Sequence, residues 1–145
     1  MKEKNFRVIF DTNVWISFLI GKSLSIVKKF IFENKITIIV SQQLIDELTE
    51  VTGRKKIRKY FPNESVLELI DLLETIAEIF VVKPTHFICR DQKDNFLLDL
   101  IEFSKADYLV TGDKDLLELT PFQTATILTP NNFDKEMFSM FEINS

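Results

Sequence analysis

Short apolar runs alternate along the chain with longer segments whose apolar residues recur every three or four positions. The short runs are typical of buried β-strands, and the spaced segments are typical of amphipathic helices. Strands are expected at 7–10, 35–41, 79–84, 107–113 and 124–130. Helices are expected at 14–20, 24–33, 42–52, 63–78, 94–104 and 132–141, with a short helical turn at 115–119. Strands that alternate with helices and are apolar on both faces predict an α/β fold, with a mostly parallel five-stranded sheet between two layers of helices.

The length of the chain is that of one domain. A chain of 145 residues can bury about 70% of its unfolded surface around a single core. Three glycines and four prolines leave little sequence for linkers. We therefore expect residues 1–145 to form a single domain.

Charge and cysteine content narrow the class of protein. A net charge of −4 argues against a surface that is basic throughout, so contact with nucleic acid would need a local basic patch or metal ions at an acidic site. One cysteine and one histidine cannot supply an intrachain disulfide or a structural zinc site. Asp11 interrupts the first apolar run, and the next one, 14–20, is too short to span a bilayer. These features predict a cytoplasmic protein without membrane contact.

Two aspartates follow predicted strands. Asp11 ends the first strand, and Asp113 ends the fourth. Ligand sites in open parallel sheets lie outside the carboxyl ends of the strands, so both side chains are expected at one edge. The alternative for Asp11 is a helix N-cap, because Asp-Thr-Asn at 11–13 reads as the turn before a helix.

Two further acids lie on the inward faces of predicted helices. Glu47 falls on the border of the apolar stripe of its helix, and Asp94 falls between inward-facing leucines and isoleucine. Asp99 and Glu102, on the same helix as Asp94, are expected to point to water. Asp115 is expected to be the N-cap of the turn that it begins.

Each of the four converging acids also has a structural interpretation as a cap, a turn residue or a solvated acid. Together, however, four carboxylates at one edge would repel each other by several kcal/mol unless a cation neutralised them. Oxygen ligands without histidine or cysteine suit Mg²⁺ or Mn²⁺. The leading hypothesis is therefore a phosphoryl-transfer site that binds one or two such ions.

Four segments resemble the PIN domain family, and most closely the bacterial members that are toxins of toxin–antitoxin pairs (VapC-like ribonucleases). They are "VIFDTNVWIS" at 8–17, "SQQLIDELTEV" at 41–51, "CRDQKDNFLLDL" at 89–100 and "ADYLVTGDKDLL" at 106–117. The resemblance implies a nuclease that binds divalent metal and hydrolyses RNA phosphodiester bonds in line, leaving a 5′-phosphate. It also implies an antitoxin protein and a second copy of the chain as partners.

The same resemblance assigns roles to individual residues. The catalytic and metal-binding positions that it implies are Asp11, Glu47, Asp94 and Asp113. The supporting positions that it implies are Asn13, Thr111, Asp91 and Asp115. The loop "RDQKDNFLL" has fewer acids than in many relatives, and the inward helical face favours Asp94 over Asp91 as the more direct ligand.

A basic segment offers a second contact for RNA. The cations of "GRKKIRKYF" are Arg54, Lys55, Lys56, Arg58 and Lys59. Such a run is often only a solvated face, but in an acidic protein it can attract phosphates, with Tyr60 available for base stacking. Contact there should weaken with salt.

Two other functions fit parts of the sequence. A Mg²⁺-dependent phosphatase with an aspartyl nucleophile at Asp11 would usually have a second acid two residues later, where Asn13 stands. A catalytically silent PIN-fold module that binds RNA or another partner would not need all four acids. Metal-dependent cleavage separates these hypotheses.

Overall fold

The strands form one fully parallel sheet, in the order β3-β2-β1-β4-β5. The computed structural model describes residues 5–142. Residues 1–4 and 143–145, which the single-domain prediction includes, lie outside the described residues. The strands are β1 (Phe6–Phe10), β2 (Ile36–Ser41), β3 (Glu78–Phe80), β4 (Tyr108–Val110) and β5 (Thr126–Leu128). The predicted five-stranded parallel sheet is confirmed.

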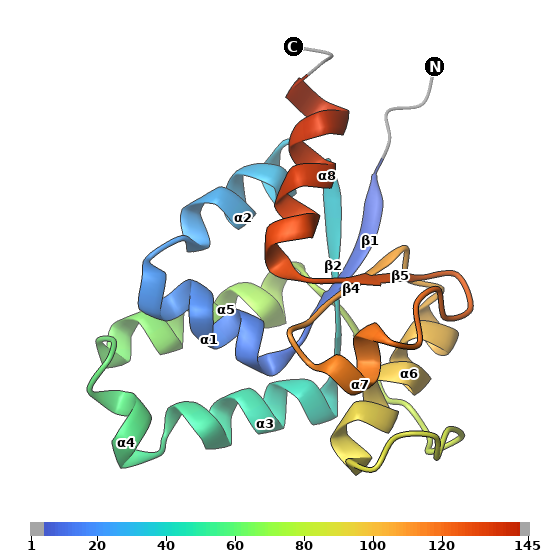
Figure 1. The fold of residues 1–145 in the computed structure, drawn as a ribbon. Coiled ribbons are helices and arrows are strands. Elements are labelled where there is room, and N and C mark those ends of the chain that lie inside the picture. Colours follow the sequence, from blue (N-terminus) through green and yellow to red (C-terminus); the bar gives the residue numbers. More distant parts are fainter. Residues whose placement is uncertain (1–4, 143–145) are drawn as a thin grey trace.

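Helices cover both faces of this sheet (Figure 1). They are α1 (Thr12–Gly21), α2 (Leu24–Phe32), α3 (Gln42–Thr52), α4 (Lys55–Arg58), α5 (Asn63–Ile76), α6 (Gln92–Ser104), α7 (Lys114–Leu117) and α8 (Pro130–Glu142). In Figure 1, α1, α2, α5 and α8 lie on one side of the sheet and α6 lies on the other. The predicted α/β/α layering is therefore confirmed. None of the helices in the described part of the chain is long and apolar enough to cross a membrane.

Aromatic packing joins β1 to the helices on one face. Phe10, at the end of β1, meets Trp15 of α1 edge to face at 5.0 Å between ring centroids. It meets Phe133 of α8 in the same way at 5.5 Å. Trp15 is completely buried, so α1 is fixed against the end of the strand that precedes it. Such aromatic pairs contribute about 0.5–1.5 kcal/mol beyond their buried area.

Three strands are shorter than the sequence predicted. Each of β3, β4 and β5 spans three residues, in place of the predictions 79–84, 107–113 and 124–130. After β3 the chain has no regular structure up to α6. Val82 is buried there without strand pairing, and its carbonyl accepts a hydrogen bond from Gln43 Nε2 at 3.2 Å, whereas the neighbouring Val81 is 82% exposed.

Four helices begin earlier than predicted, and one was not predicted. α6 begins at Gln92 in place of 94, and α7 at Lys114 in place of 115. α1 begins at Thr12, so the predicted turn at 11–13 is reduced to Asp11. α8 begins at Pro130 because proline suits the first position of a helix, where its missing N–H has no intrahelical role. The basic segment forms the short helix α4, which its run of polar residues does not indicate.

The strand order reverses between β1 and β4, the place where ligand sites form in open parallel sheets. The chain passes from β1 to β2 on one side, whereas β4 lies on the other side of β1. The carboxyl ends of these strands open toward the edge where Figure 1 shows α3 and α7. The functional site is therefore sought at this edge.

Candidate functional site

Asp11 and Thr111 lie side by side at the ends of β1 and β4. The register pairs Phe10 with Val110, and the backbone N–H of Asp11 donates to the Val110 carbonyl at 3.0 Å. The fully buried Thr111 then donates its hydroxyl to Asp11 Oδ2 at 2.7 Å. Asp11 stands at the N-cap position of α1 but makes no side-chain capping bond, so the capping alternative for its carboxylate is wrong.

Asp113 lies beyond the end of β4 and caps α7. Its Oδ1 accepts a hydrogen bond from the backbone N–H of Asp115 at 2.8 Å, and its own N–H donates to Thr111 Oγ1 at 3.1 Å. The prediction that Asp115 is the cap is therefore wrong, because Asp113 occupies that position and Asp115 lies inside the first turn. Thr111 thus contacts both Asp11 and the backbone of Asp113.

Asp94 reaches the same edge from the first turn of α6. Asp91, which is exposed, caps this helix by accepting from the N–H of Lys93 at 2.9 Å. Asp94 is only 6% exposed, as its inward helical position predicted. One carboxylate oxygen from each of Asp94, Asp113 and Asp115 lies within 4.8 Å of the others. We call these three residues the acidic cluster.

The fourth predicted acid, Glu47, approaches from the middle of α3. It is half-buried and accepts a hydrogen bond from Thr12 Oγ1 at 3.1 Å. Its charge and that of Asp11 influence each other, because the neighbouring Glu47 carboxylate helps to raise the pKa of Asp11. Thr12 could not be identified from the sequence, since its contact with Glu47 depends on the packing of α1 against α3.

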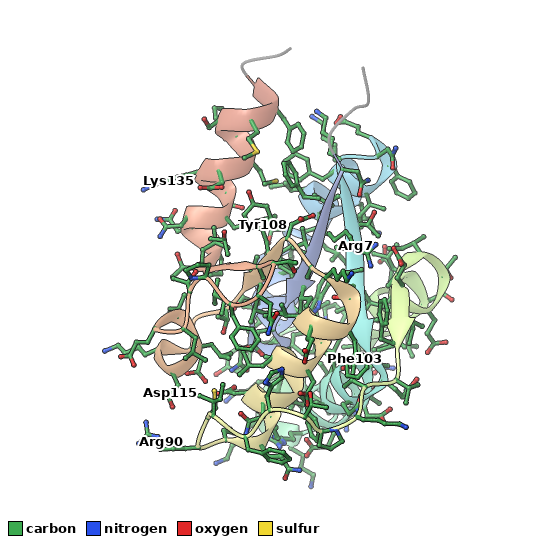
Figure 2. All side chains as sticks on the ribbon, turned by 90° about the vertical axis from the view of Figure 1, so that its right-hand side faces the viewer. Arg7, Arg90, Phe103, Tyr108, Asp115 and Lys135 are labelled. Carbon is green, nitrogen blue, oxygen red and sulfur yellow. The ribbon has the colours of Figure 1, made fainter. Side chains whose placement is uncertain are left out.

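Two cations near the start of α6 pair with these acids. Lys93 Nζ lies 3.3 Å from Glu47 Oε1. Arg90 Nη2 lies 3.2 Å from both oxygens of Asp115, and Figure 2 shows the two side chains together at one end of the molecule. The Arg90 side chain is 89% exposed, so this ion pair lies at the mouth of the acidic cluster and is open to solvent.

Burial and like charge act together on the carboxyl groups. Burial, followed by the hydrogen bond and the charge of Asp113, raises the pKa of Asp94 to about 7. Burial also raises the pKa of Asp11, although the hydrogen bond from Thr111 opposes this rise. Both carboxyl groups therefore lie where only a proton or a cation can offset their charge.

The acidic cluster has the ligands that a hard divalent cation requires. Oδ2 of Asp94 is buried and has no hydrogen-bond donor among residues 5–142. Its neighbours are carboxylates, which can donate to it only when protonated. Carboxylate oxygens at this spacing fit Mg²⁺ or Mn²⁺, which bind through a few carboxylates and keep several waters.

Asp99 differs from its sequence expectation. It is completely buried, so the prediction that it points to water is wrong. Its Oδ1 accepts hydrogen bonds from Thr85 N at 3.1 Å, Thr85 Oγ1 at 2.7 Å and His86 N at 2.9 Å. The irregular segment after β3 folds over this side of α6 and donates these hydrogen bonds to the Asp99 carboxylate. Glu102, by contrast, is exposed as predicted and pairs with His86 Nε2 at 2.7 Å.

Other predicted residues lie outside the acidic cluster. Asn13 is exposed, and its side chain makes no hydrogen bond within the described residues. The basic segment lies at and beyond the far end of α3, where Arg54 pairs with Glu50 at 2.9 Å. The arrangement therefore separates a site that attracts cations from a segment that attracts anions.

Three comparisons relate the chain to known proteins. A family model for the PIN domain matches residues 7–115. An uncharacterized protein of Methanocaldococcus jannaschii is 34% identical over 126 residues, which cover 82% of this chain and 78% of that protein. The solved structure of the PIN domain endonuclease Utp24 aligns with a TM-score of 0.48 and 18% identity, covering 76% of this chain and 73% of that one.

Proposed function

Because the chain belongs to the PIN domain family, we propose that it is a divalent-metal-dependent endoribonuclease that hydrolyses RNA phosphodiester bonds. PIN domains are generally nucleases that use divalent metals, and membership of this family supports the proposal. The observation that carries it is the acidic cluster, in which one carboxylate oxygen from each of Asp94, Asp113 and Asp115 lies within 4.8 Å of the others and Asp94 is buried.

The proposed metal ligands are Asp94 and Asp113 of the acidic cluster together with Asp11 and Glu47. Asp115 joins them because its carboxylate lies in the cluster. One or two Mg²⁺ or Mn²⁺ ions, when bound, would supply an activated water and would stabilise charge on the leaving 3′ oxygen.

Other residues of the chain hold these ligands in place. Thr111 orients Asp11 through its 2.7 Å hydrogen bond and fixes the backbone of Asp113. Asp91 caps the helix that carries Asp94. Arg90 and Lys93 offset part of the negative charge through their ion pairs with Asp115 and Glu47.

The proposal extends to a toxin role, with an antitoxin protein and a second copy of the chain as partners. Its support is the resemblance of the four sequence segments to toxin components. Induced expression of the wild-type chain in bacteria should stop growth, and the Asp94→Asn variant at equal protein level should not. Equal growth of both cultures would remove the toxin role and leave the nuclease proposal standing.

Two alternatives are less well supported. An aspartyl phosphatase would need an acid two residues after Asp11, and the exposed Asn13 stands there. A catalytically silent module is disfavoured because the repulsion among the clustered carboxylates of Asp94, Asp113 and Asp115 lowers stability and has no structural use in such a protein. The extent of the domain, residues 1–145, stays a prediction.

The decisive experiment is cleavage of a structured RNA and a single-stranded RNA with Mn²⁺, Mg²⁺ or EDTA. The wild-type protein should cut at least one of them only when metal is present. Asp94→Asn should reduce the rate by at least about 100-fold, since it removes a charged ligand without changing size. Asp71→Asn makes the same chemical change on the exposed side of α5 and should cut like the wild type.

Each other outcome contradicts the proposal. Equal cutting by the wild type and Asp94→Asn would identify a contaminating nuclease. No cutting by the wild type, together with no Mn²⁺ binding in calorimetry, would favour the silent module. Release of inorganic phosphate from a phosphomonoester without RNA cleavage would favour the phosphatase.

A further inference from the structure

The basic segment forms one wall of a cavity between α4 and the beginning of α5. The cavity has a volume of ≈ 490 Å³. Three cations line it, namely Lys55, Arg58 and Lys59, and no acidic side chain does. Asn63, the first residue of α5, lies on the opposite wall, and the buried Phe61 is part of the lining. This concave surface is separate from the acidic cluster.

The cations that line this cavity have no carboxylate partners. Within residues 5–142, Lys55, Arg58 and Lys59 form no ion pair, whereas the neighbouring Arg54 pairs with Glu50 at 2.9 Å. Exposed lysines on a convex surface are often only solvated. Here the positive charges surround one hollow, where their fields add and attract an anion.

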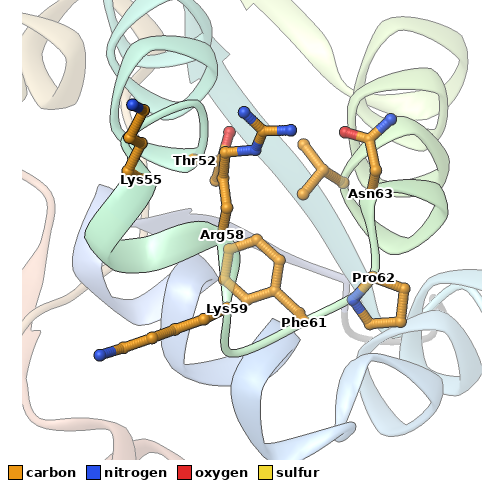
Figure 3. Close-up of a pocket in the computed structure, with 8 residues that line it drawn as sticks. Thr52, Lys55, Arg58, Lys59, Phe61, Pro62 and Asn63 are labelled. Carbon is orange, nitrogen blue, oxygen red and sulfur yellow. The ribbon is translucent and has the colours of Figure 1, made fainter.

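The side chains are not equivalent in position. Figure 3 shows the Arg58 guanidinium extending into the space between α4 and α5, with Asn63 across from it and Lys59 leading away. The Thr52 hydroxyl is already used, because it donates to the Leu48 carbonyl at 2.7 Å. Arg58 is therefore the central donor of the cavity, and the two lysines add charge around it.

The start of α5 adds to the positive potential. α5 has 14 residues and begins after Pro62, and no side chain caps its first turn, although the acid Glu64 in that turn offsets part of its positive potential. The uncapped N–H groups and the helix dipole favour negative charge at this end. This feature is secondary to the unpaired cations, but it has the same sign.

We propose that this cavity binds a backbone phosphate of the RNA strand whose scissile bond lies at the acidic cluster. The inference rests on the proposed function and adds a second, metal-independent contact with the same substrate. A guanidinium with free donors is suited to phosphate oxygens, which it can bind through two parallel hydrogen bonds.

The position of the cavity fits an RNA strand that continues from the proposed cleavage site. α3 carries Glu47 near its middle and ends at Thr52, which lines the cavity. These two residues are about 7.5 Å apart along the helix axis and about 140° apart around it, at ~1.5 Å and ~100° per residue, so the RNA strand would pass around α3 between the two sites. Figure 1 shows α3 running from the edge near α7 toward α4. A few nucleotides would therefore reach from one site to the other.

The test measures RNA binding without cleavage. Fluorescence anisotropy of a labelled single-stranded RNA in EDTA gives the Kd of each variant at several salt concentrations. The double variant Lys55→Gln/Arg58→Gln should raise the Kd at least about 10-fold and should reduce the slope of log Kd against log salt by about 0.7, the amount that one lost phosphate contact removes for a single strand. The control Arg54→Gln/Lys56→Gln loses the same charge outside the cavity, and its Kd should change less than about 3-fold.

A second variant separates binding from folding. Asn63→Asp places a negative charge in the cavity and should weaken RNA binding, although an acid in the first turn of a helix favours helix stability. Asn131→Asp makes the same change in the first turn of α8, and its Kd should stay at the wild-type value. Weaker RNA binding by Asn63→Asp, with a melting temperature no lower than wild type, cannot come from misfolding.

Several results would overturn the inference. Equal loss of affinity in both double variants would mean diffuse attraction by the whole basic segment. Binding of adenosine monophosphate as tight as that of RNA, and abolished by Arg58→Gln, would identify a site for a free nucleotide. Failure of the proposed function gives a different result, because RNA would then bind through the cavity without being cut when Mn²⁺ is added.

Discussion

Two buried aspartates of α6, Asp94 and Asp99, show how neighbouring groups decide the use of a carboxylate. Both are less than a tenth exposed. One oxygen of Asp99 accepts three hydrogen bonds from the segment that covers it, so its charge stabilises the fold. Asp94 instead faces the carboxyl groups of Asp113 and Asp115, where its charge is unfavourable until a cation or a proton arrives. The two residues should therefore respond in opposite ways to substitution.

The stability of the metal-free protein should depend on the protonation of Asp94. Its pKa of about 7 in the folded protein lies above the ordinary value of 3.8. Between these values the folded state binds more protons than the unfolded state, so its stability falls as pH rises through this window. In EDTA, the melting temperature of the wild type relative to Asp94→Asn should rise by a few degrees when pH falls from about 8 to about 5.5. If the melting temperatures of the two proteins changed equally with pH across this range, the protonation assigned to Asp94 would be contradicted.

Asp99 should contribute to stability rather than to cleavage. Asp99→Ala leaves the donors of Thr85 and His86 without their acceptor and should lower the free energy of unfolding by about 2–4 kcal/mol. Glu102→Ala removes an exposed acid from the same helix and should lower it by less than about 1 kcal/mol. Urea unfolding measures both. Equal losses would mean that the covering segment does not depend on Asp99.

At the scale of elements, the turn between β4 and α7 links the acids of two strands. The Thr111 hydroxyl accepts a hydrogen bond from the backbone N–H of Asp113 and donates one to the Asp11 carboxylate. One hydroxyl therefore positions both the backbone after β4 and the acid that follows β1. Its place is set by the pairing of Phe10 with Val110. When a group that hydrogen-bonds to a metal ligand is mutated, the affinity for the metal usually falls about 10–100-fold. The loss of an orienting hydrogen bond explains an effect of this size.

Substitution of Thr111 tests this link. Thr111→Val keeps the shape but removes the hydroxyl, and it should weaken Mn²⁺ binding about 10–100-fold in calorimetry. Cleavage should fall at non-saturating metal and recover partly when more Mn²⁺ is added. Thr111→Ser retains the hydroxyl and should bind Mn²⁺ within about 3-fold of the wild type. A valine variant with unchanged Mn²⁺ affinity would show that Thr111 does not position the ligands.

At the scale of the whole molecule, the fold separates its charges. The acidic cluster lies at the carboxyl edge of the sheet with Asp11 and Glu47 near it, and unpaired cations line the cavity beside α4. A net charge of −4 hides this separation. Repulsion among the acids lowers the stability of the metal-free fold, so a bound cation should increase it.

Mn²⁺ should therefore raise the melting temperature of the wild type. Saturation to about 100 times the Kd adds about 2.7 kcal/mol, which corresponds to roughly 5–10 °C for a chain of this length. The double variant Asp94→Asn/Asp113→Asn should shift by less than about 2 °C, and Asp71→Asn should shift like the wild type. Differential scanning fluorimetry gives these values, and an equal shift in all three proteins would indicate binding elsewhere.

The sequence by itself determined the layers and most of the elements. Apolar runs and helical stripes depend on neighbours in the chain, so the parallel sheet, its helices and the inward face of Asp94 could be predicted from spacing alone. The same local rules overextended the strands at 79–84, 107–113 and 124–130, because the pattern along the chain does not show where a neighbouring strand stops pairing.

Only the tertiary structure decided which polar groups meet. Asp99 is buried because a segment about fourteen residues earlier folds over it, and Asp115 joins the acidic cluster because Asp113 takes the cap. The contacts of Thr111 with Asp11 and of Thr12 with Glu47 join residues 100 and 35 positions apart. The cavity beside α4 likewise needs the beginning of α5 as its second wall. Such contacts depend on which distant segments come close together in space. The spacing of apolar and polar residues along the chain does not specify this.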